Sequence, residues 1–235
     1  MIPGGRLVVL GKQGAGKGTQ CVRVSHHYVV PHISTGDMLR AAVKAGTKLG
    51  LEARRYMDDG ELVPDEVLLR MVQERLEQDD TRSRGFVLDG FPRTVAQAQG
   101  LDALLAPASL DLVIDLEVPT ELVLERLASR RVCEDCGQIY STALPPSVDW
   151  ICDICGGEVV QREDDTEDAI RRRLALYESE TAPLIAWYEN LDKLAKVSGV
   201  GHPDEVFNRI VDEIDSRRSE GAFGPPIGVD GQEQP

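Results

Sequence analysis

Residues 11–19 (Gly-Lys-Gln-Gly-Ala-Gly-Lys-Gly-Thr) have the composition and spacing of a loop that binds phosphate groups. They follow an apolar run at 7–10, typical of a buried parallel strand, and residues 20–30 contain no Gly or Pro to interrupt a helix. Glycines allow the backbone N–H groups to point inward and, together with the helix N-terminus, to cradle an anion. Lys17 would then reach the β and γ phosphates.

This loop departs from the usual pattern at one position. Gly18 stands where Ser or Thr usually binds Mg²⁺, and Thr19 comes one position later. The alternative interpretation is a surface turn with a solvated lysine. Strand, spacing and helix agree with a phosphate site, although the loop alone specifies only nucleotide phosphates.

Four of the five cysteines form two Cys-x-x-Cys pairs, Cys133/Cys136 and Cys152/Cys155, with fifteen residues between the pairs. This spacing predicts a structural Zn²⁺ site with four thiolate ligands and no open position, which would supply folding energy to a module with little core. Two disulfides or a redox pair are the alternatives; the missing secretion signal argues against disulfides. A zinc ribbon can also bind nucleic acid, but the local sequence is acidic. Cys21 is expected to be a buried, small apolar residue.

Several arginines lie at predicted strand ends and hinges. Arg93 follows an apolar run at 86–88 and a proline, Arg126 and Arg130 are expected to share one face of a helix opened by Pro119, and Arg162 follows the cysteine module. Arg173 lies on the next helix beside Arg171 and Arg172, which we interpret as surface charges. Because a guanidinium binds phosphate oxygens bidentately, these residues suggest a phosphate clamp.

Asp89 ends the apolar run at 86–88, next to the predicted P-loop strand. A carboxylate at this place could orient Mg²⁺-bound water. The alternative is a capped Asp-Gly turn with no role in chemistry.

Apolar runs bounded by turn residues predict five strands, and helical patterns lie between them: 7–10, 32–33, 86–88, 112–116 and 194–197. The alternation predicts an α/β fold with a parallel sheet, whose strand carboxyl ends would gather the P-loop, 34–37 and 89–93. Residues 34–63, with turns at Gly46 and Gly60, are expected to form a helical insertion. The segment 221–235 is rich in Gly and Pro and is predicted to be disordered.

The 235 residues carry a formal net charge of −14, so nucleic acid is not expected as the main partner. No apolar run approaches the ~20 residues needed to cross a bilayer, and no signal peptide is recognisable. A soluble cytoplasmic protein without a membrane partner is the expectation.

With these motifs the sequence resembles the adenylate kinases, in the bacterial long form with a zinc-binding lid, over about 7–211. The resemblance rests on 14–20, 33–40, 89–94 with Gln97, the four cysteines, and Arg162-x-Asp164-Asp165 followed by Arg173. It implies the reaction ATP + AMP ⇌ 2 ADP with Mg²⁺, a structural Zn²⁺, and a monomer. It also implies a P-loop NTPase-type sheet of five parallel strands flanked by helices. The implied parts are a core domain (1–33, 64–129 and 167–217), an AMP-binding domain (34–63), a lid (130–166) and a disordered tail (218–235).

The resemblance also implies roles for individual residues. The catalytic set would be Lys17, Arg93, Arg130, Arg162 and Arg173. The ATP site would comprise Gly14, Ala15, Gly16, Lys17, Gly18, Thr19, Arg130, Ile139, Tyr140 and Gly201. The AMP site would comprise Thr35, Arg40, Glu61, Leu62, Val63, Gly90, Phe91, Pro92, Arg93, Gln97, Arg162 and Arg173. Asp164 and Asp165 would orient the lid arginines.

One position departs from the family pattern, and three rival functions fit some of the motifs. Gln13 stands where relatives usually have Pro, which could loosen the loop before Gly14. A uridylate or cytidylate kinase would share the P-loop and the Gly-Phe-Pro-Arg motif, but Thr35 and Gln97 favour adenine, because a Gln amide offers both a donor and an acceptor. A nucleotide sensor without turnover would share the P-loop and the lid, and a nucleic-acid adaptor would share the zinc ribbon.

Overall fold

A computed structural model describes residues 5–162 and 165–224. Five parallel strands form the central sheet in the order β2-β3-β1-β4-β8. Their bounds are β1 Arg6–Leu10, β2 His32–Ser34, β3 Phe86–Asp89, β4 Leu112–Glu117 and β8 Leu194–Ser198. The five predicted strands and the parallel sheet are therefore confirmed.

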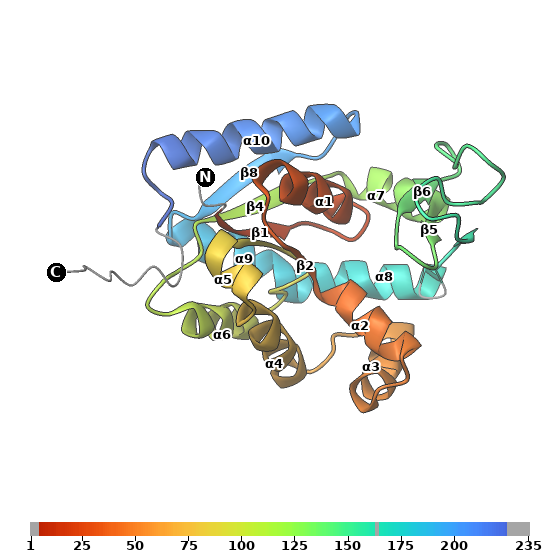
Figure 1. Ribbon diagram of the computed structural model, residues 1–235, viewed down its shortest axis with the longest axis horizontal. Coiled ribbons are helices and arrows are strands. Elements are labelled where there is room, and N and C mark those ends of the chain that lie inside the picture. Colours follow the sequence, from red (N-terminus) through yellow and green to blue (C-terminus); the bar gives the residue numbers. More distant parts are fainter. Residues whose placement is uncertain (1–4, 163–164, 225–235) are drawn as a thin grey trace.

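Helices cover both faces of this sheet (Figure 1). Their bounds are α1 Lys17–Tyr28, α2 Thr35–Lys44, α3 Lys48–Asp59, α4 Asp65–Leu76, α5 Asp79–Arg84, α6 Val95–Leu105, α7 Thr120–Ser129, α8 Glu167–Leu176, α9 Ala182–Asn190 and α10 Pro203–Ser219. A π-helical turn, Tyr177–Thr181, joins α8 to α9. Within the described ranges, no helix has the length and apolar character needed to cross a bilayer.

Alternate residues of each central strand serve two different hydrophobic cores. Val8 and Leu88 belong to the core beneath α4, α6 and α9, whereas Val9 and Val87 belong to the core beneath α1, α7 and α10. Successive side chains of a strand point to opposite faces, so a sheet covered on both sides needs continuous apolar runs. This two-sided burial fixes the strand register, and thereby the position of each strand's carboxyl end.

Two inserts extend from the core beside one another (Figure 1). Residues 34–63 contain α2 and α3, and the turns predicted at Gly46 and Gly60 have φ angles of 64° and 72°. The segment 130–166 contains a small antiparallel sheet of β5 (Arg130–Cys133), β6 (Ile139–Ser141) and β7 (Val159–Val160). Lys44 Nζ on α2 lies 3.6 Å from Asp135 Oδ1, so the two inserts touch.

The predicted tail, 218–235, lies partly outside the described residues. Where it is described, the structure differs from the prediction: α10 continues to Ser219, and Phe223 packs against the core beneath α1, α7 and α10. The Gly224 N–H donates to Asp111 Oδ1 at 2.9 Å. The chain is held here because an aromatic ring and a backbone donor find partners on the core, which composition alone does not reveal.

Candidate active site

The P-loop joins β1 to α1 and leaves the amides of the first helical turn without helical acceptors. Gly14 and Gly16 have φ angles of 83° and 101°, and Gly16 is the N-cap of α1. A Cβ at Gly14 would come 2.8 Å from Leu127 on α7, so the loop is also packed too closely for a side chain. Positive φ and close packing together require glycine at this position. The result is a backbone concavity that suits an anion.

Lys17, the first residue of α1, lies over this concavity. Its Nζ donates to the carbonyl oxygens of Gly11 at 2.7 Å and Lys12 at 2.9 Å. Burial lowers the pKa of Lys17 to about 8, the charge of Asp89 opposes this shift, and the charges of Arg93 and Arg130 add to it. The ammonium is buried beside other positive charges, so negatively charged phosphate oxygens placed here would stabilise it.

Arginines from separate segments face the same space. Burial and the guanidinium of Arg173 lower the pKa of Arg93, whereas Asp89 raises it. Arg93 is held in place because its Nε donates to Gly90 O at 2.8 Å. Arg162 is half-buried, and its charge helps to lower the pKa of Asp37 on α2. These cations come from the end of β3, the segment after the cysteine module and α8; Arg93 acts on Lys17 and Arg173 acts on Arg93, whereas Arg162 acts on Asp37.

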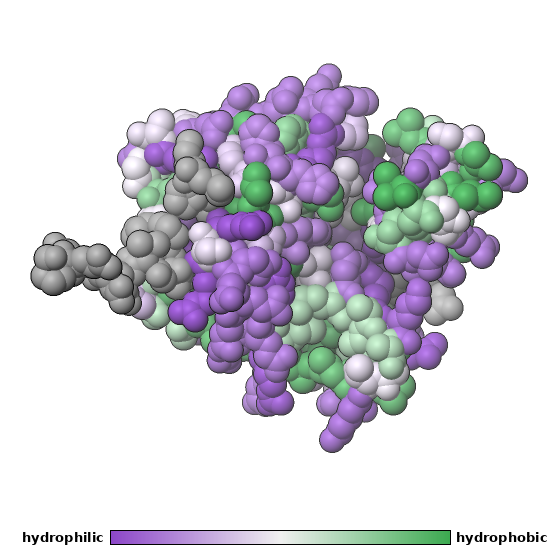
Figure 2. Space-filling view, viewed as in Figure 1, coloured by the Kyte–Doolittle hydropathy of each residue, from purple (hydrophilic) through white to green (hydrophobic). Residues whose placement is uncertain are grey.

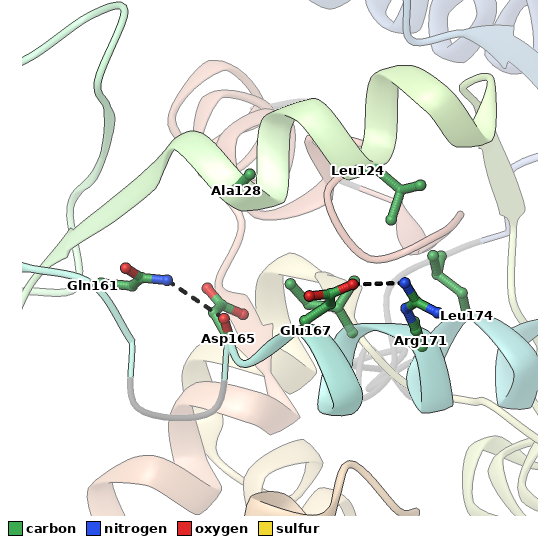
Figure 3. Close-up of a pocket in the computed structure, with 8 residues that line it drawn as sticks. Leu124, Ala128, Gln161, Asp165, Glu167, Arg171 and Leu174 are labelled. Carbon is green, nitrogen blue, oxygen red and sulfur yellow. Dashed lines mark hydrogen bonds and ion pairs between the residues drawn. The ribbon is translucent and has the colours of Figure 1, made fainter.

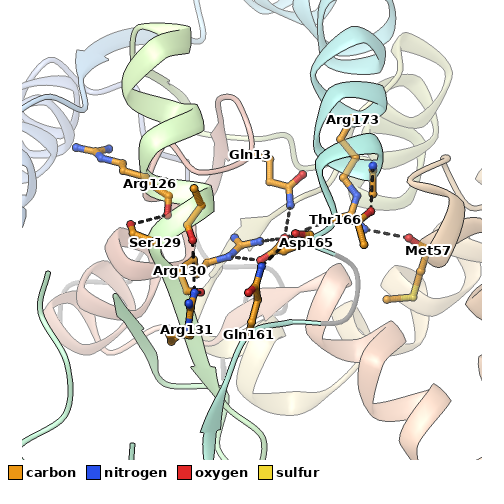
Figure 4. A network of polar contacts seen from close by, with 12 residues as sticks. Gln13, Met57, Arg126, Ser129, Arg130, Arg131, Gln161, Asp165, Thr166 and Arg173 are labelled. Carbon is orange, nitrogen blue, oxygen red and sulfur yellow. Dashed lines mark hydrogen bonds and ion pairs between the residues drawn. The ribbon is translucent and has the colours of Figure 1, made fainter. Parts of the chain in front are cut away.

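Asp165 is the centre of a polar network at the hinge of the lid (Figure 4). Its carboxylate is fully buried and accepts a bidentate pair from Arg130, with Nε to Oδ2 at 2.8 Å and Nη2 to Oδ1. Arg173 Nη1 lies 3.9 Å from Asp165 Oδ1, and Arg173 Nη2 donates to Met57 O at 3.0 Å. The carboxylate thus holds one arginine from each side of the hinge. Asp164, the other predicted lid-orienting residue, lies outside the described residues.

Gln13 contributes to the same network, which was not expected. Its Nε2 donates to Asp165 Oδ1 at 3.2 Å (Figure 4). The residue that replaces the usual proline therefore connects the P-loop to the lid hinge. Gln13 and Asp165 are 152 positions apart in the sequence, so no local pattern could indicate that they form a hydrogen bond.

The prediction that Arg126 and Arg130 share one helix face is wrong. Helix α7 ends at Ser129, and Arg130 begins β5, where it pairs with Ser141 of β6. Strand pairing within the lid overrides the helical pattern at this point. Arg126 instead donates to Ala15 O and Gly199 O, each at 3.1 Å. It therefore bridges the P-loop to the loop that carries Gly201, which has a φ of 113°.

Two carboxylates lie on β3 and β4, the strands that flank β1 on either side. Asp89 ends β3, and a Cβ at Gly18 would lie 3.3 Å from Asp89 Oδ2, so this carboxylate faces the P-loop as predicted. Asp115 pairs in register with Leu10 of β1 and was missed. Its side chain is buried, its Oδ1 has no hydrogen-bond partner among the described residues, and burial raises its pKa to about 6. The signal for it was an acid inside an otherwise apolar run.

On the predicted AMP side, the polar side chains bond to the protein. Thr35 Oγ1 donates to Gly90 O at 3.0 Å, and Arg40 pairs with Asp37. Gln97 is fully buried: its Oε1 accepts from the Arg93 N–H at 2.7 Å, and its Nε2 donates to Asp65 Oδ1 at 2.6 Å. Asp65 was missed, since nothing in its local sequence suggests that it orients Gln97.

The remaining residues predicted for the AMP side lie in the connection at 61–63 and directly after β3. Residues 61–63 form the connection from α3 to α4, and Val63 is buried in the core beneath α4. Phe91 and Pro92 are buried between β3 and α6. The backbone is close to α8 here, because a Cβ at Gly60 would meet Ala169 O at 3.0 Å. The structure thus brings the end of the insert at 34–63 against the helix that carries Arg173.

The four lid cysteines converge as predicted. Their Sγ atoms all lie within 4.8 Å of one another, with Cys133–Cys155 at 3.4 Å and Cys136–Cys152 at 3.5 Å, and all are free. Four thiolates about 2.3 Å from Zn²⁺ in a tetrahedron are about 3.8 Å apart, so the cluster fits this metal. Gly137 and Gly156 turn the chain after each pair, with φ angles of 75° and 77°.

Ile139 and Tyr140 have different surroundings, although both were assigned to the ATP site. A Cβ at Gly18 would lie 3.6 Å from Ile139 Cδ1, which places Ile139 over the P-loop. The Tyr140 hydroxyl donates to Cys152 Sγ at 3.4 Å and accepts from the Asp153 N–H at 2.8 Å. Neighbouring strand residues point to opposite faces, so only one of the two can face the P-loop.

A hollow of about 720 Å³ lies between α7 and α8, beside the hinge network (Figure 3). Glu167 and Arg171 pair across one turn of α8 at its edge. Its lining residues are Leu124, Ala128, Gln161, Asp165, Glu167, Ile170, Arg171 and Leu174. No P-loop residue lines this hollow, so it is not the phosphate site that the sequence predicts at 11–19.

A parallel sheet with a P-loop, a set of cations beside it and a small cysteine-bearing insert define a nucleotide phosphotransferase of the P-loop class. The family described as adenylate kinase matches residues 9–193. An adenylate kinase from Thermodesulfovibrio yellowstonii is 55% identical over 208 residues, which cover 87% of this chain and 96% of the relative. Adenylate kinases from Clostridium perfringens and Syntrophobacter fumaroxidans are each 50% identical, over 87% of this chain and 96% and 97% of the relatives. The chain belongs to the adenylate kinase family.

Proposed function

We propose that this protein catalyses the reversible, Mg²⁺-dependent reaction ATP + AMP ⇌ 2 ADP. The observation that supports this most directly is the grouping of four cations near the P-loop. The charges of Arg93 and Arg130 act on Lys17, and the charge of Arg173 acts on Arg93. Arg130 and Arg173 are also both close to the carboxylate of Asp165. Phosphoryl transfer requires positioning and charge neutralisation more than covalent chemistry, and this arrangement provides both.

In this proposal the amides of 14–19 and Lys17 hold the ATP phosphates. Arg93, Arg162 and Arg173 hold the phosphates between the two nucleotides, and Arg130 approaches from the lid hinge. Asp165 keeps Arg130 oriented, so little side-chain ordering is left to the binding step. Mg²⁺ bound with ATP would neutralise phosphate charge, with Asp89 positioned to orient its water ligands.

Gln97 would select adenine on the acceptor side. Its amide orientation is fixed by its partners, because the Arg93 N–H can only donate and the Asp65 carboxylate can only accept. One N–H and one carbonyl lone pair of the amide remain; the side chain has no exposed surface in this structure, so pairing with the complementary acceptor and donor of an adenine edge would require it to become accessible. Thr35 and the connection at 61–63 complete this side.

The lid would close over ATP with a structural Zn²⁺ held by Cys133, Cys136, Cys152 and Cys155. Closure excludes water, which otherwise hydrolyses the transferred group. We further propose that opening or closing, rather than chemistry, limits turnover. Equal turnover in a variant with a stiffened lid hinge would contradict this. The monomeric state, the cytoplasmic location, and the absence of nucleic-acid and membrane partners stay predictions.

A coupled assay of ADP formation tests the proposal. The protein receives Mg-ATP with AMP, UMP, CMP or GMP in turn, and turnover with AMP alone is expected. Gln97→Leu should raise KM for AMP about tenfold per hydrogen bond lost, with KM for ATP unchanged. Gln138→Leu, on the exposed side of the lid, is the matched control. Turnover with UMP or CMP would overturn the acceptor assignment, and nucleotide binding without turnover would indicate a sensor.

A further inference from the structure

Cys21, His32 and Asp89 form a second cluster of metal-ligating groups, separate from the lid cysteines. Their ligand atoms all lie within 4.8 Å of one another. They come from three elements that the sheet brings together: α1 behind the P-loop, β2 at the sheet edge, and the carboxyl end of β3. No sequence motif connects them.

The donor atoms of this cluster are almost fully enclosed. Cys21 has no exposed surface, and the His32 and Asp89 side chains are 19% and 13% exposed. His32 Nε2 is buried and has no hydrogen-bond partner among the described residues; it lies 3.7 Å from Asp89 Oδ2. A buried imidazole nitrogen without a hydrogen bond is uncommon in folded proteins. It points to a ligand that the three groups can share.

We propose that Cys21, His32 and Asp89 bind a second Zn²⁺, or a similar thiophilic divalent cation, and that this metal inhibits phosphoryl transfer. One thiolate, one imidazole and one carboxylate are the ligand types that zinc accepts, with the fourth position left to water. Mg²⁺ prefers oxygen ligands, so a Cys–His pair selects against it. The site would therefore respond to zinc and ignore the magnesium of the reaction.

The geometry requires only a small adjustment. Zinc with bond lengths of about 2.0–2.3 Å places tetrahedral ligand atoms about 3.3–3.8 Å apart. The His32–Asp89 distance of 3.7 Å is already in that range, and the separations to Cys21, below 4.8 Å, must shorten by about 1 Å at most. As the zinc–sulfur bond forms, the thiol proton of Cys21 leaves to solvent, and no oxidant or reductant is involved.

Inhibition follows from the position of Asp89. This inference rests on the proposed function, in which Asp89 orients Mg²⁺-bound water beside Gly18. A carboxylate that ligates zinc is no longer available for that task. The charge of Asp89 also acts on Lys17, so a cation beside Asp89 reduces the negative potential that supports the ammonium. The lid site has four ligands and no open position, so the two sites differ in how readily they exchange metal.

Metal stoichiometry provides the first test. Protein carrying one zinc per chain in the lid is equilibrated with buffered free Zn²⁺ without nucleotide, and bound metal is measured by native mass spectrometry. Wild type is expected to take a second metal, whereas Cys21→Ala and His32→Gln stay at one. His27→Gln, which changes a histidine on the exposed side of the same helix, should still take two. A wild type that stays at one metal, or a Cys21→Ala variant that binds the second equally well, overturns the site.

Inhibition provides the second test. Buffered Zn²⁺ should lower the rate with Mg-ATP and AMP in wild type. Loss of a group that only hydrogen-bonds to a metal ligand lowers metal affinity about 10–100-fold, so loss of a ligand should have at least that effect. Cys21→Ala and His32→Gln should therefore raise the half-inhibiting zinc concentration by at least ~10–100-fold. Their rates without added zinc should be unchanged. Equal inhibition of wild type and both variants would overturn the regulatory role. A second bound metal in a protein without AMP-dependent turnover would instead refute the proposed function and leave the site standing.

Discussion

The central sheet buries apolar side chains on both faces, whereas the lid's apolar cluster consists of Cys133, Cys152 and Val159. The lid also exposes large apolar residues, which gather on its surface in Figure 2: Leu144, Val148, Ile151 and Ile154. Burial can stabilise the first region and contributes little to the second. The two regions therefore depend on different contacts: the core on apolar burial, and the predicted lid on its four-cysteine cluster and on polar contacts around Asp165.

Metal removal should separate the two regions most strongly. Structural zinc contributes apparent binding energies of about 10–16 kcal/mol in zinc-finger peptides, so a lid with almost no core should unfold without it. A chelator should make 130–166 sensitive to protease while the core keeps its far-UV circular dichroism. Cys136→Ser should behave like the chelated protein, and Cys21→Ala should not. A lid that resists protease after metal loss would show that its contacts suffice without the metal.

A cavity in the core should destabilise the core, whereas metal removal should unfold the lid and leave the core intact. Phe86 on β3 has no exposed surface, and Phe86→Ala should lower the free energy of unfolding by about 3–5 kcal/mol. Urea denaturation should show one cooperative shift of the whole core. Leu144→Ala on the lid, where the side chain is 67% exposed, is the control and should change stability by less than about 0.5 kcal/mol. Similar losses in both variants would refute the contrast.

Substitutions in the network around Asp165 should have smaller effects than either of these two changes. Arg130→Met removes the bidentate partner of a fully buried carboxylate, and an unsatisfied buried acceptor costs about 1–3 kcal/mol. Gln13→Ala removes one neutral donor from the same carboxylate and should cost about 0.5–1.5 kcal/mol. Hydrogen exchange should show faster opening of the lid amides in both variants, with the core unchanged. Arg171→Met, which breaks an exposed pair on α8, should have no such effect.

The smallest predicted effect is the uptake of a fraction of a proton by Lys17 when ATP binds. Its folded pKa of about 8 lies below its ordinary value of 10.5, so the unfolded chain binds more protons between these values and stability rises with pH across that window. Bound phosphates favour the ammonium and raise the pKa, so ATP binding at pH 8 should take up protons, and at pH 6 it should not. Calorimetry in buffers of different ionisation enthalpy measures this. Lys17→Arg keeps the charge without titrating near pH 8, so proton uptake persisting in it would contradict the assignment.

Local sequence patterns were sufficient for the five strands of the central sheet, the P-loop and the convergence of the four lid cysteines. Apolar runs predicted the five strands because a strand buried on both faces must be apolar throughout. Glycine spacing predicted the P-loop, and the two Cys-x-x-Cys pairs predicted that four thiols converge, because each pattern specifies its own local geometry. The family resemblance added the role of each residue, which those patterns do not contain.

Tertiary structure alone decided which partners the polar side chains have. Gln13 reaches Asp165, Gln97 is oriented by Asp65, and the Tyr140 hydroxyl reaches Cys152. Arg130 leaves the predicted helix because β5 pairs with β6. The physical reason is common to all of these cases. Periodicity along the chain encodes which face of an element is buried, whereas a hydrogen bond or a shared ligand depends on the register between elements that are distant in sequence. The cluster of Cys21, His32 and Asp89 exists for that reason, since only the order of strands β2, β3 and β1 brings it together.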